Sequence, residues 1–235
     1  MAKSRSVFVC QQCGAESPKW MGRCNSCGEW NSLVEQKVAG TPRHAFYTED
    51  RIHAVPESLD KILPDKVERI DLGNKEFNRV LGGGLVPGSV VLIGGEPGIG
   101  KSTLALQVAL QADRDTLYVS GEESPQQLKL RAERLAKGNG RCRVLAETNL
   151  QAILSHLETD RPRLLIIDSI QTLSSGEIES APGTVSQVRE CAVHLLRVAK
   201  ELHLPVILIG HITKDGSLAG PKVLEHIVDT VLQFE

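Results

Sequence analysis

Aromatic residues are scarce in this chain: they make up 3% of 235 residues, with two tryptophans, two tyrosines and four phenylalanines. The core must therefore be aliphatic, and a hydrophobic fraction of 41% is enough to build one. No apolar run approaches the roughly 18 residues of a membrane helix, and no signal peptide opens the sequence. We therefore expect a soluble, cytoplasmic protein with no membrane partner.

An excess of charge of either sign is also missing. The formal net charge is −2, from 27 basic and 29 acidic residues. Without a global basic field, any binding of nucleic acid must rely on local patches. The sequence has no internal repeat and no low-complexity run, and its length suits one α/β domain plus a small module.

One glycine-rich stretch organises the rest of the chain. Residues 95–102 read Gly-Glu-Pro-Gly-Ile-Gly-Lys-Ser, which is the G-x-x-x-x-G-K-S pattern of phosphate-binding loops. A β-branched run at 89–93 precedes it and helix formers at 103–110 follow. A strand, a loop and a helix in this order surround an anion with backbone N–H groups at a positive helix end, whereas a chance glycine turn would not keep all three in register.

The loop predicts ATP and Mg²⁺ as ligands. We expect Lys101 to reach the β- and γ-phosphates and the Ser102 hydroxyl to hold Mg²⁺. Asp168 follows four apolar residues that read as a buried central strand, and it is the expected second Mg²⁺ group, acting through a water. The predicted nucleotide-binding residues are Gly95, Glu96, Pro97, Gly98, Ile99, Gly100, Lys101, Ser102, Thr103 and His211.

Hydrolysis also needs a group that orients and deprotonates water. We predict Glu122, with Lys101 and Asp168 as the other catalytic residues, because Glu122 ends a strand expected to lie beside the phosphate loop. Glu123 is the alternative base, and only one of the two can serve, since neighbours on an extended strand point to opposite faces. The simpler alternative is that both carboxylates are solvated surface charges. His211 either senses the γ-phosphate and relays nucleotide state, or is a hydrogen-bonded structural histidine.

Four of the six cysteines form a C-x2-C-x10-C-x2-C pattern near the N-terminus. They are predicted to bind one structural Zn²⁺ and are Cys10, Cys13, Cys24 and Cys27. Gly14 and Gly28 follow the two knuckles, where a tight turn needs them. Two disulfides or a redox pair are the alternatives. Trp20 and Trp30 are expected to fill the module's small core rather than form a contact surface. The remaining cysteines, Cys142 and Cys191, are expected in the main core.

Alternating helices and strands predict a mainly parallel sheet flanked by helices. Helices are expected at 74–81, 103–110, 125–136, 148–158 and 185–202, and strands at 89–93, 116–120, 143–146, 164–168, 205–210 and 231–235. Asn74 is an expected N-cap, and the residues at 124–127 and 148–151 both read as capping boxes. The predicted division is a four-cysteine module at 1–34, a linker at 35–69 containing three prolines, and an ATPase core at 70–235. The chain stops within the last strand, so we expect the core to be incomplete at its C-terminus.

Several segments taken together resemble one known family. They are the cysteine knuckles, Arg-Val-Leu-Gly-Gly-Gly-Leu-Val-Pro-Gly at 79–88, the phosphate loop to Thr103, Tyr-Val-Ser-Gly-Glu-Glu-Ser at 118–124, and Gly-His-Ile-Thr-Lys-Asp-Gly-Ser-Leu-Ala-Gly-Pro-Lys-Val-Leu-Glu-His at 210–226. Over nearly the whole chain these segments resemble the bacterial RadA (Sms) family of DNA-repair proteins, which are RecA-like ATPases. The knuckles and the last segment are specific, whereas the loop alone is not.

The resemblance implies a hexameric, helicase-like ring that drives branch migration of recombination intermediates. Its partners would be single-stranded DNA, branched intermediates and a RecA-like recombinase. DNA would lie in the central channel against the loops at about 174–184 and 212–222, and Lys214 and Lys222 are the candidate DNA-binding residues. The family continues with a Lys-Asn-Arg-Phe-Gly motif and a Lon-protease-like domain that this sequence lacks. Because such a motif supplies a basic residue to a neighbour's nucleotide, worth about 10³–10⁵ in rate, we expect this truncated chain to bind ATP better than it hydrolyses it.

Two other functions fit parts of the pattern. A KaiC-type ATPase acting on protein partners would also carry Glu122 and Glu123 in tandem. A zinc-knuckle adaptor would use its nucleotide pocket only as a structural switch. The knuckles and the loop bearing Lys214 and Lys222 favour the DNA-dependent ATPase.

Overall fold

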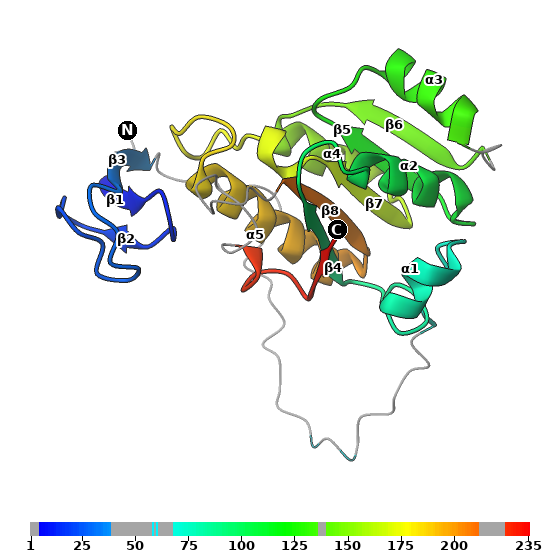
Figure 1. The fold of residues 1–235 in the computed structure, drawn as a ribbon, viewed down its shortest axis with the longest axis horizontal. Helices are drawn as coiled ribbons and strands as arrows, with labels where there is room; N and C mark the ends of the chain where they lie inside the picture. The colour runs from blue at the N-terminus through cyan, green and yellow to red at the C-terminus, as the bar shows by residue number, and fades with distance from the viewer. Residues whose placement is uncertain (1–4, 39–57, 59, 61–67, 136–139, 212–223) are drawn as a thin grey trace.

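The computed structural model describes residues 5–38, 58, 60, 68–135, 140–211 and 224–235. These residues form a three-stranded sheet near the N-terminus and a six-stranded sheet flanked by helices (Figure 1). Among the described residues, no helix is both long and apolar enough to cross a membrane.

The large sheet is parallel throughout. Its strands are β4 (Val90–Gly95), β5 (Thr116–Ser120), β6 (Cys142–Ala146), β7 (Leu164–Asp168), β8 (Val206–His211) and β9 (Thr230–Gln233). They lie in the order β6-β5-β7-β8-β4-β9, and every neighbouring pair is parallel. The predicted fold class is confirmed, and each predicted strand is present within one or two residues.

The strand order corrects one expectation about Glu122. The strand before it, β5, does not lie beside β4 and the phosphate loop, because β7 and β8 lie between them. A hydrophobic run shows that a strand is buried on both faces, but it carries no information on which strands flank it. The prediction of adjacency was therefore wrong.

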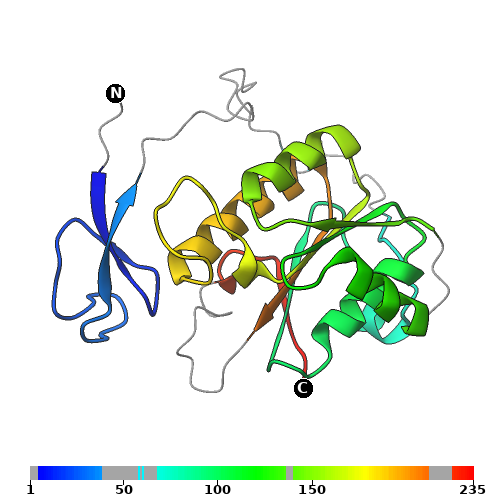
Figure 2. The same ribbon diagram turned by 90° about the horizontal axis from the view of Figure 1, so that it is seen from above.

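Helices cover both faces of the sheet (Figures 1 and 2). One face packs against α1 (Lys75–Val80), α2 (Lys101–Gln111) and α3 (Pro125–Leu135), and the other against α4 (Leu150–Asp160) and α5 (Val185–Leu202). Alternate residues of β4 point to opposite faces: Val91 and Ile93 pack in the hydrophobic cluster on the side of α1, α2 and α3, and Val90 and Leu92 pack in the cluster on the side of α4 and α5. A short 3₁₀ turn, η2 (Ile170–Thr172), follows β7.

Side-chain caps begin three of the helices. The Asn74 side chain accepts a hydrogen bond from the Phe77 N–H at 3.0 Å, as expected of an N-cap. Ser124 and Gln127 form the predicted reciprocal box before α3. At α4 the predicted start at 148 is wrong: Asn149 is the N-cap, because its side-chain oxygen accepts from the Ala152 N–H at 3.0 Å.

The small sheet consists of β1 (Arg5–Cys10), β2 (Glu16–Ser17) and β3 (Leu33–Val38) in the antiparallel order β2-β1-β3. Because β3 pairs with the whole of β1, the folded module continues to Val38, past the predicted boundary at 34. Most of the predicted linker lies outside the described residues. The module lies beside the N-terminal end of α5 in both views (Figures 1 and 2).

Two direct hydrogen bonds join the module to the large domain. The Gln36 side chain donates to the Ser186 hydroxyl at 2.6 Å, and the Arg189 guanidinium donates to the Gly14 carbonyl at 2.9 Å. Gly14 has a φ of 72°, and a Cβ there would lie 3.3 Å from Val185. Gly14 is therefore needed both for the turn after Cys13 and for the approach of α5.

The tryptophans of the module do not fill its core. Trp20 is 57% exposed and Trp30 is 67% exposed, so the prediction that they are buried was wrong. The buried hydrophobic cluster of the module consists of Cys10, Cys24 and Leu33, and apolar side chains smaller than tryptophan pack around it. The two cysteines outside the knuckles are placed as predicted: Cys191 is buried, Cys142 is partly buried, and both pack in the main core.

Candidate nucleotide and metal sites

The phosphate loop connects the end of β4 to the start of α2. Gly98 and Gly100 have φ values of 79° and 113°, which glycine adopts without strain. Gly95 is required for a different reason, because a Cβ there would lie 2.6 Å from the Phe234 carbonyl oxygen, just after β9. The loop at 96–99 is exposed, while Gly95 and Lys101 at its two ends are buried.

Lys101 is the buried cation of the site, with 3% of its surface exposed. Its Nζ donates to the carbonyl oxygens of Gly95 at 2.8 Å and Glu96 at 2.7 Å. Burial lowers the pKa of Lys101, and the negative charges of Asp168 and Glu122 oppose that shift. The ammonium group therefore interacts electrostatically with both carboxylates.

Ser102 and Asp168 meet although 66 residues separate them in sequence. The Ser102 hydroxyl donates to Asp168 Oδ1 at 2.9 Å, and the Tyr118 hydroxyl donates to Oδ2 at 2.5 Å. Asp168 thus lies at the carboxyl end of β7, facing the first turn of α2 and held by β5. Burial and the Asp168 carboxylate raise the pKa of Tyr118, so its hydroxyl stays protonated and remains a donor.

The oxygens of Ser102 and Asp168 are of the kind that Mg²⁺ prefers. Adjacent ligands of an octahedral ion with bonds of about 2.1 Å lie roughly 3 Å apart. The 2.9 Å separation of Ser102 Oγ and Asp168 Oδ1 fits that spacing, and it also leaves room for a carboxylate that acts through a water. These two residues therefore fit the predicted magnesium site.

The two neighbouring glutamates have different partners. Glu122 Oε1 accepts from the Ser169 hydroxyl at 2.9 Å and lies 3.3 Å from His211 Nε2. Glu123 instead forms an ion pair with Arg131 of α3. Both residues lie in a bend after the end of β5, so the predicted alternation of side chains along an extended strand does not apply to them. The two glutamates differ instead in the residues that they contact. The bend brings Glu122 across the end of β7 to β8.

His211 ends β8 opposite Gly95 of β4. Its Nε2 contacts Glu122, its carbonyl accepts from the Gln171 amide at 3.3 Å, and its buried Nδ1 has no hydrogen-bond partner within the described part of the chain. The histidine therefore links the glutamate to the strand that precedes the loop at 212–222. That loop contains Lys214 and Lys222, which lie outside the described residues.

Several residues of the site were missed by the sequence reasoning. Tyr118 reads as an ordinary strand residue, and Ser169 and Gln171 read as the turn after β7. Gly121 follows the end of β5, and a Cβ there would clash with the Thr172 side chain, so the bend depends on glycine. Only the strand order brings these residues together. For Gly121, Ser169 and Gln171 the one available signal was their position after a strand end, and for Tyr118 in the middle of β5 there was none.

The loop at 174–184, expected to contact DNA, is tied to α5 by one side chain. The Gln187 amide donates to the carbonyls of Ser175, Ile178 and Ser180 at 3.2, 3.3 and 2.8 Å, and its oxygen accepts from the Ser175 N–H at 2.8 Å. Gln187 is 2% exposed. The base of this loop is therefore fixed relative to α5.

The four knuckle cysteines form a compact cluster. Their sulfurs all lie within 4.8 Å of one another, with Cys10–Cys27 at 3.7 Å and Cys13–Cys24 at 3.6 Å. Thiolates around a tetrahedral Zn²⁺ at about 2.3 Å are roughly 3.8 Å apart. Because disulfide sulfurs lie about 2 Å apart, the spacing fits zinc and not the alternative of two disulfides.

The environment of the cluster favours a bound cation. Burial acts to raise the pKa of Cys10, but hydrogen bonds with Ser32 and with backbone N–H groups lower it to about 6. At Cys27 the Glu29 N–H lowers the pKa, while burial and the three neighbouring thiols raise it to about 12. The Cys10 thiolate therefore forms readily, whereas Cys27 keeps its proton unless a bound cation compensates the negative charge of the neighbouring thiolates.

Comparison with known proteins agrees with both sites. Residues 55–217 match the AAA domain family, which is more than half of the chain. The chain belongs to the AAA domain family. Residues 8–35 match the rubredoxin metal binding domain family, as the four-cysteine cluster requires.

Relatives and a solved structure extend this result. The chain is 50% identical over 241 residues to the DNA repair protein RadA of Bacillus subtilis (strain 168), and 49% identical over 239 residues to that of Listeria monocytogenes serovar 1/2a. Each alignment covers 100% of this chain, with 53% and 52% of the relative, so the chain spans about half the length of these curated relatives. The resemblance to the RadA family is therefore confirmed.

The fold also resembles a KaiC-like protein from Pyrococcus horikoshii OT3, with a TM-score of 0.57 and 22% identity. The alignment covers 71% of this chain and 81% of that protein. At this level of identity the likeness shows the fold alone. It confirms the predicted RecA-like architecture of the core.

Proposed function

We propose that this chain is a Mg²⁺-dependent ATPase acting in recombinational DNA repair. The observation that carries the proposal is the meeting of Lys101, Ser102, Asp168 and Glu122 at one edge of the sheet, although the chain separates the first and last of them from Asp168 by 67 and 46 positions. The names of the relatives supply the biological context. We propose a zinc module that continues to Val38, a linker at 39–69 in place of the predicted 35–69, and an ATPase core from 70.

In this proposal the phosphate loop and the N-terminus of α2 hold the phosphates of ATP. The N–H groups of the loop donate to phosphate oxygens, and Lys101 exchanges one of its bonds to the Gly95 and Glu96 carbonyls for a phosphate oxygen. Ser102 and Asp168 would hold Mg²⁺, which neutralises charge that develops on the phosphates. Tyr118 fixes the Asp168 carboxylate by donating to Oδ2.

Glu122 is the proposed base. It orients the attacking water and accepts its proton, and the bonds from Ser169 and His211 hold its carboxylate in place. The ion pair with Arg131 directs Glu123 to α3 and supports Glu122 over its neighbour. His211 then relays the state of the site to the following loop, because it contacts Glu122 through its side chain and ends β8.

Two variants with matched chemistry test the base. Glu122→Gln keeps the size and hydrogen-bonding of the side chain but removes the base, and we expect kcat to fall by about 10²–10⁴. Glu123→Gln makes the same change one residue away and should cost less than about tenfold. Equal losses in the two variants would contradict the assignment of Glu122.

The finer proposal is stimulation by DNA, in a hexameric ring that processes branched recombination intermediates together with a RecA-like recombinase. It is supported by the names of the relatives and by the resemblance, under which Lys214 and Lys222 would lie in a channel loop. ATP hydrolysis measured with and without single-stranded DNA separates the candidates. Stimulation supports this proposal, hydrolysis indifferent to DNA supports a KaiC-type ATPase, and no hydrolysis supports an adaptor.

A further inference from the structure

A second cavity opens at the edge of the sheet opposite to the phosphate loop. Pro87 precedes β4, Arg114 precedes β5, Arg163 precedes β7 and Pro205 precedes β8, so these residues gather where the parallel strands begin. The cavity they line has a volume of about 600 Å³. Pockets of about 300–1,000 Å³ accommodate small ligands.

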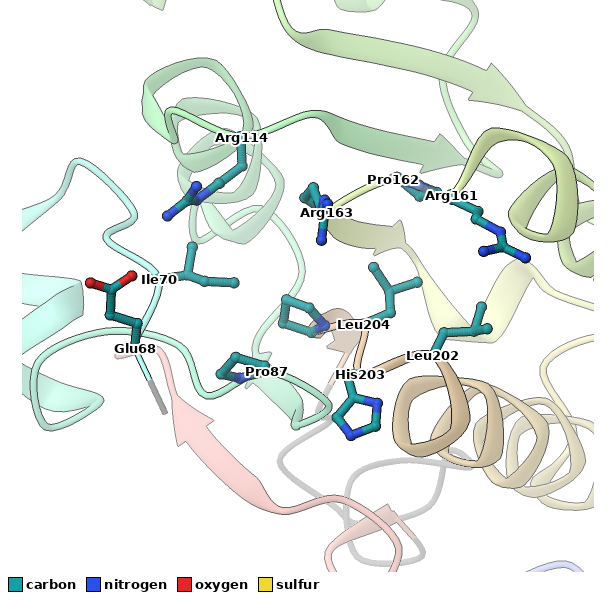
Figure 3. A pocket seen from close by; sticks show the side chains of 11 residues that line it. Glu68, Ile70, Pro87, Arg114, Arg161, Pro162, Arg163, Leu202, His203 and Leu204 are labelled. Atoms are coloured by element: carbon teal, nitrogen blue, oxygen red, sulfur yellow. The ribbon is translucent and has the colours of Figure 1, made fainter. Parts of the chain in front are cut away.

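One side of this cavity is basic and the rest is mainly apolar. In Figure 3, Arg114, Arg163 and Arg161 lie in a row along one side, with Pro87 and His203 on the opposite side and apolar residues between them. The apolar residues are Ile70, Leu202 and Leu204 together with the prolines. Guanidinium groups along a rim above an apolar surface suit a ligand that carries both an anion and a flat or hydrophobic part.

Within the described residues, the guanidinium groups of the three arginines have no polar partner, neither a hydrogen bond nor an ion pair. Three acids close to them in the sequence have other partners: Asp113 pairs with Arg141, and Asp115 and Asp160 pair with Arg143. Glu68 is the acid in the cavity lining, and no ion pair joins it to an arginine within the described residues, so the rim keeps an excess of positive charge.

A charge balance indicates how much negative charge the ligand carries. Three arginines contribute three positive charges, and Glu68 in the lining contributes one negative charge. The C-terminal ends of α4 and α5, capped at Arg161 and His203, contribute about half a negative charge each. The lining residues and these two helix ends together carry a net charge of about +1, which favours an anion of low charge such as one phosphodiester.

We propose that this pocket binds one nucleotide unit, with the arginines on its phosphate and the apolar surface against its sugar or base. The unit belongs either to a nucleic-acid strand or to a free nucleotide. This inference shares nucleic acid with the proposed function but uses a different site. It does not depend on hydrolysis at the phosphate loop, so the two can fail separately.

The test compares the full chain with the double variant Arg114→Ala/Arg163→Ala. The matched control, Lys129→Ala/Arg134→Ala, removes two charges from α3, where both side chains are exposed. All four side chains are at the surface, and thermal unfolding of each variant checks that the fold is unchanged. Basal ATP hydrolysis without DNA should also be the same in all three proteins.

Binding is measured without ATP, using a fluorescent oligothymidylate and thymidine monophosphate as probes. The Arg114→Ala/Arg163→Ala variant should bind the probe that occupies the pocket about tenfold more weakly than the unmodified chain. The affinity of the Lys129→Ala/Arg134→Ala control should change by less than about twofold. For the oligothymidylate, the slope of log affinity against log salt should fall in magnitude by about 0.7, the value for one lost phosphate contact on a single strand. Loss for the strand alone identifies nucleic acid as the source, and loss for the monophosphate identifies a free nucleotide. Unchanged binding of both probes, or an equal loss in the control, would overturn the proposal.

Discussion

The zinc module and the α/β core are stabilised in different ways. In the core, apolar side chains fill two clusters on the two faces of a parallel sheet. In the module, the described buried cluster is Cys10, Cys24 and Leu33, and two of those three are metal-ligand candidates. Little apolar surface is buried there to balance the chain entropy, so we expect the fold of the module, unlike that of the core, to depend on a bound metal.

Removing one ligand should give the largest difference between the two regions. Cys24→Ser is expected to release zinc and unfold the module, because metal binding of about 10–16 kcal/mol provides its folding free energy. ATP hydrolysis by the core should persist. Metal content by mass spectrometry and hydrolysis rate are the measurements, and Cys142→Ala, outside the cluster, is the control that should keep its zinc. A module that remains folded without metal would contradict this view.

A cavity in the core should have the opposite effect. Ile166 is fully buried in the middle of β7, and Ile166→Ala is expected to cost about 2–5 kcal/mol of unfolding free energy. Unfolding of the core in urea measures this loss. The absorbance of Co²⁺ substituted for zinc should be unchanged. Simultaneous loss of both signals would show that the two regions fold as one unit.

The contacts between the regions should matter less than either interior. Arg189→Ala removes the bond to the Gly14 carbonyl and should cost about 1 kcal/mol or less. Proteolysis in the linker, followed over time, measures how much more readily the module then separates. Arg134→Ala on α3 changes the same charge without touching the module. An equal rate of cleavage in both variants would show that this contact does not hold the module.

A small pH dependence is expected near this interface. The hydrogen bond to Glu190 raises the pKa of His194, although burial opposes the shift. The charged pair therefore stabilises the fold fully below the ordinary histidine value of about 6.5, and this contribution is lost as pH rises through the raised pKa. The loss should be below about 1 kcal/mol. Unfolding free energy measured from pH 6 to 8 should fall in the wild type and stay flatter in His194→Ala.

The exposed tryptophans show where composition misled the sequence reasoning. Large aromatic side chains normally fill a core, but a metal-dependent module has no such requirement. Trp20 and Trp30 both approach Gly22, and Arg23 lies 5.7 Å from the centre of the Trp30 ring. The sequence shows which residues of the module are apolar, but the small size of the module's core decides which of them are buried.

The sequence by itself predicted the helices and strands and the two sets of candidate ligands. Local patterns were sufficient for this: four apolar residues before Asp168, a capping box at Ser124, glycines at positive φ, and cysteine pairs two residues apart. These features depend on neighbours in the chain, so they can be read without the fold.

Only the tertiary structure decided which strands are neighbours in the sheet and which side chains meet at its edges. The strand order separates β5 from β4, yet it places Tyr118 on Asp168 and Glu122 beside His211. It also gathers Arg114, Arg161 and Arg163 at the opposite edge of the sheet. These contacts join residues tens of positions apart, and the free energy that selects them comes from packing of the whole domain rather than from any local pattern.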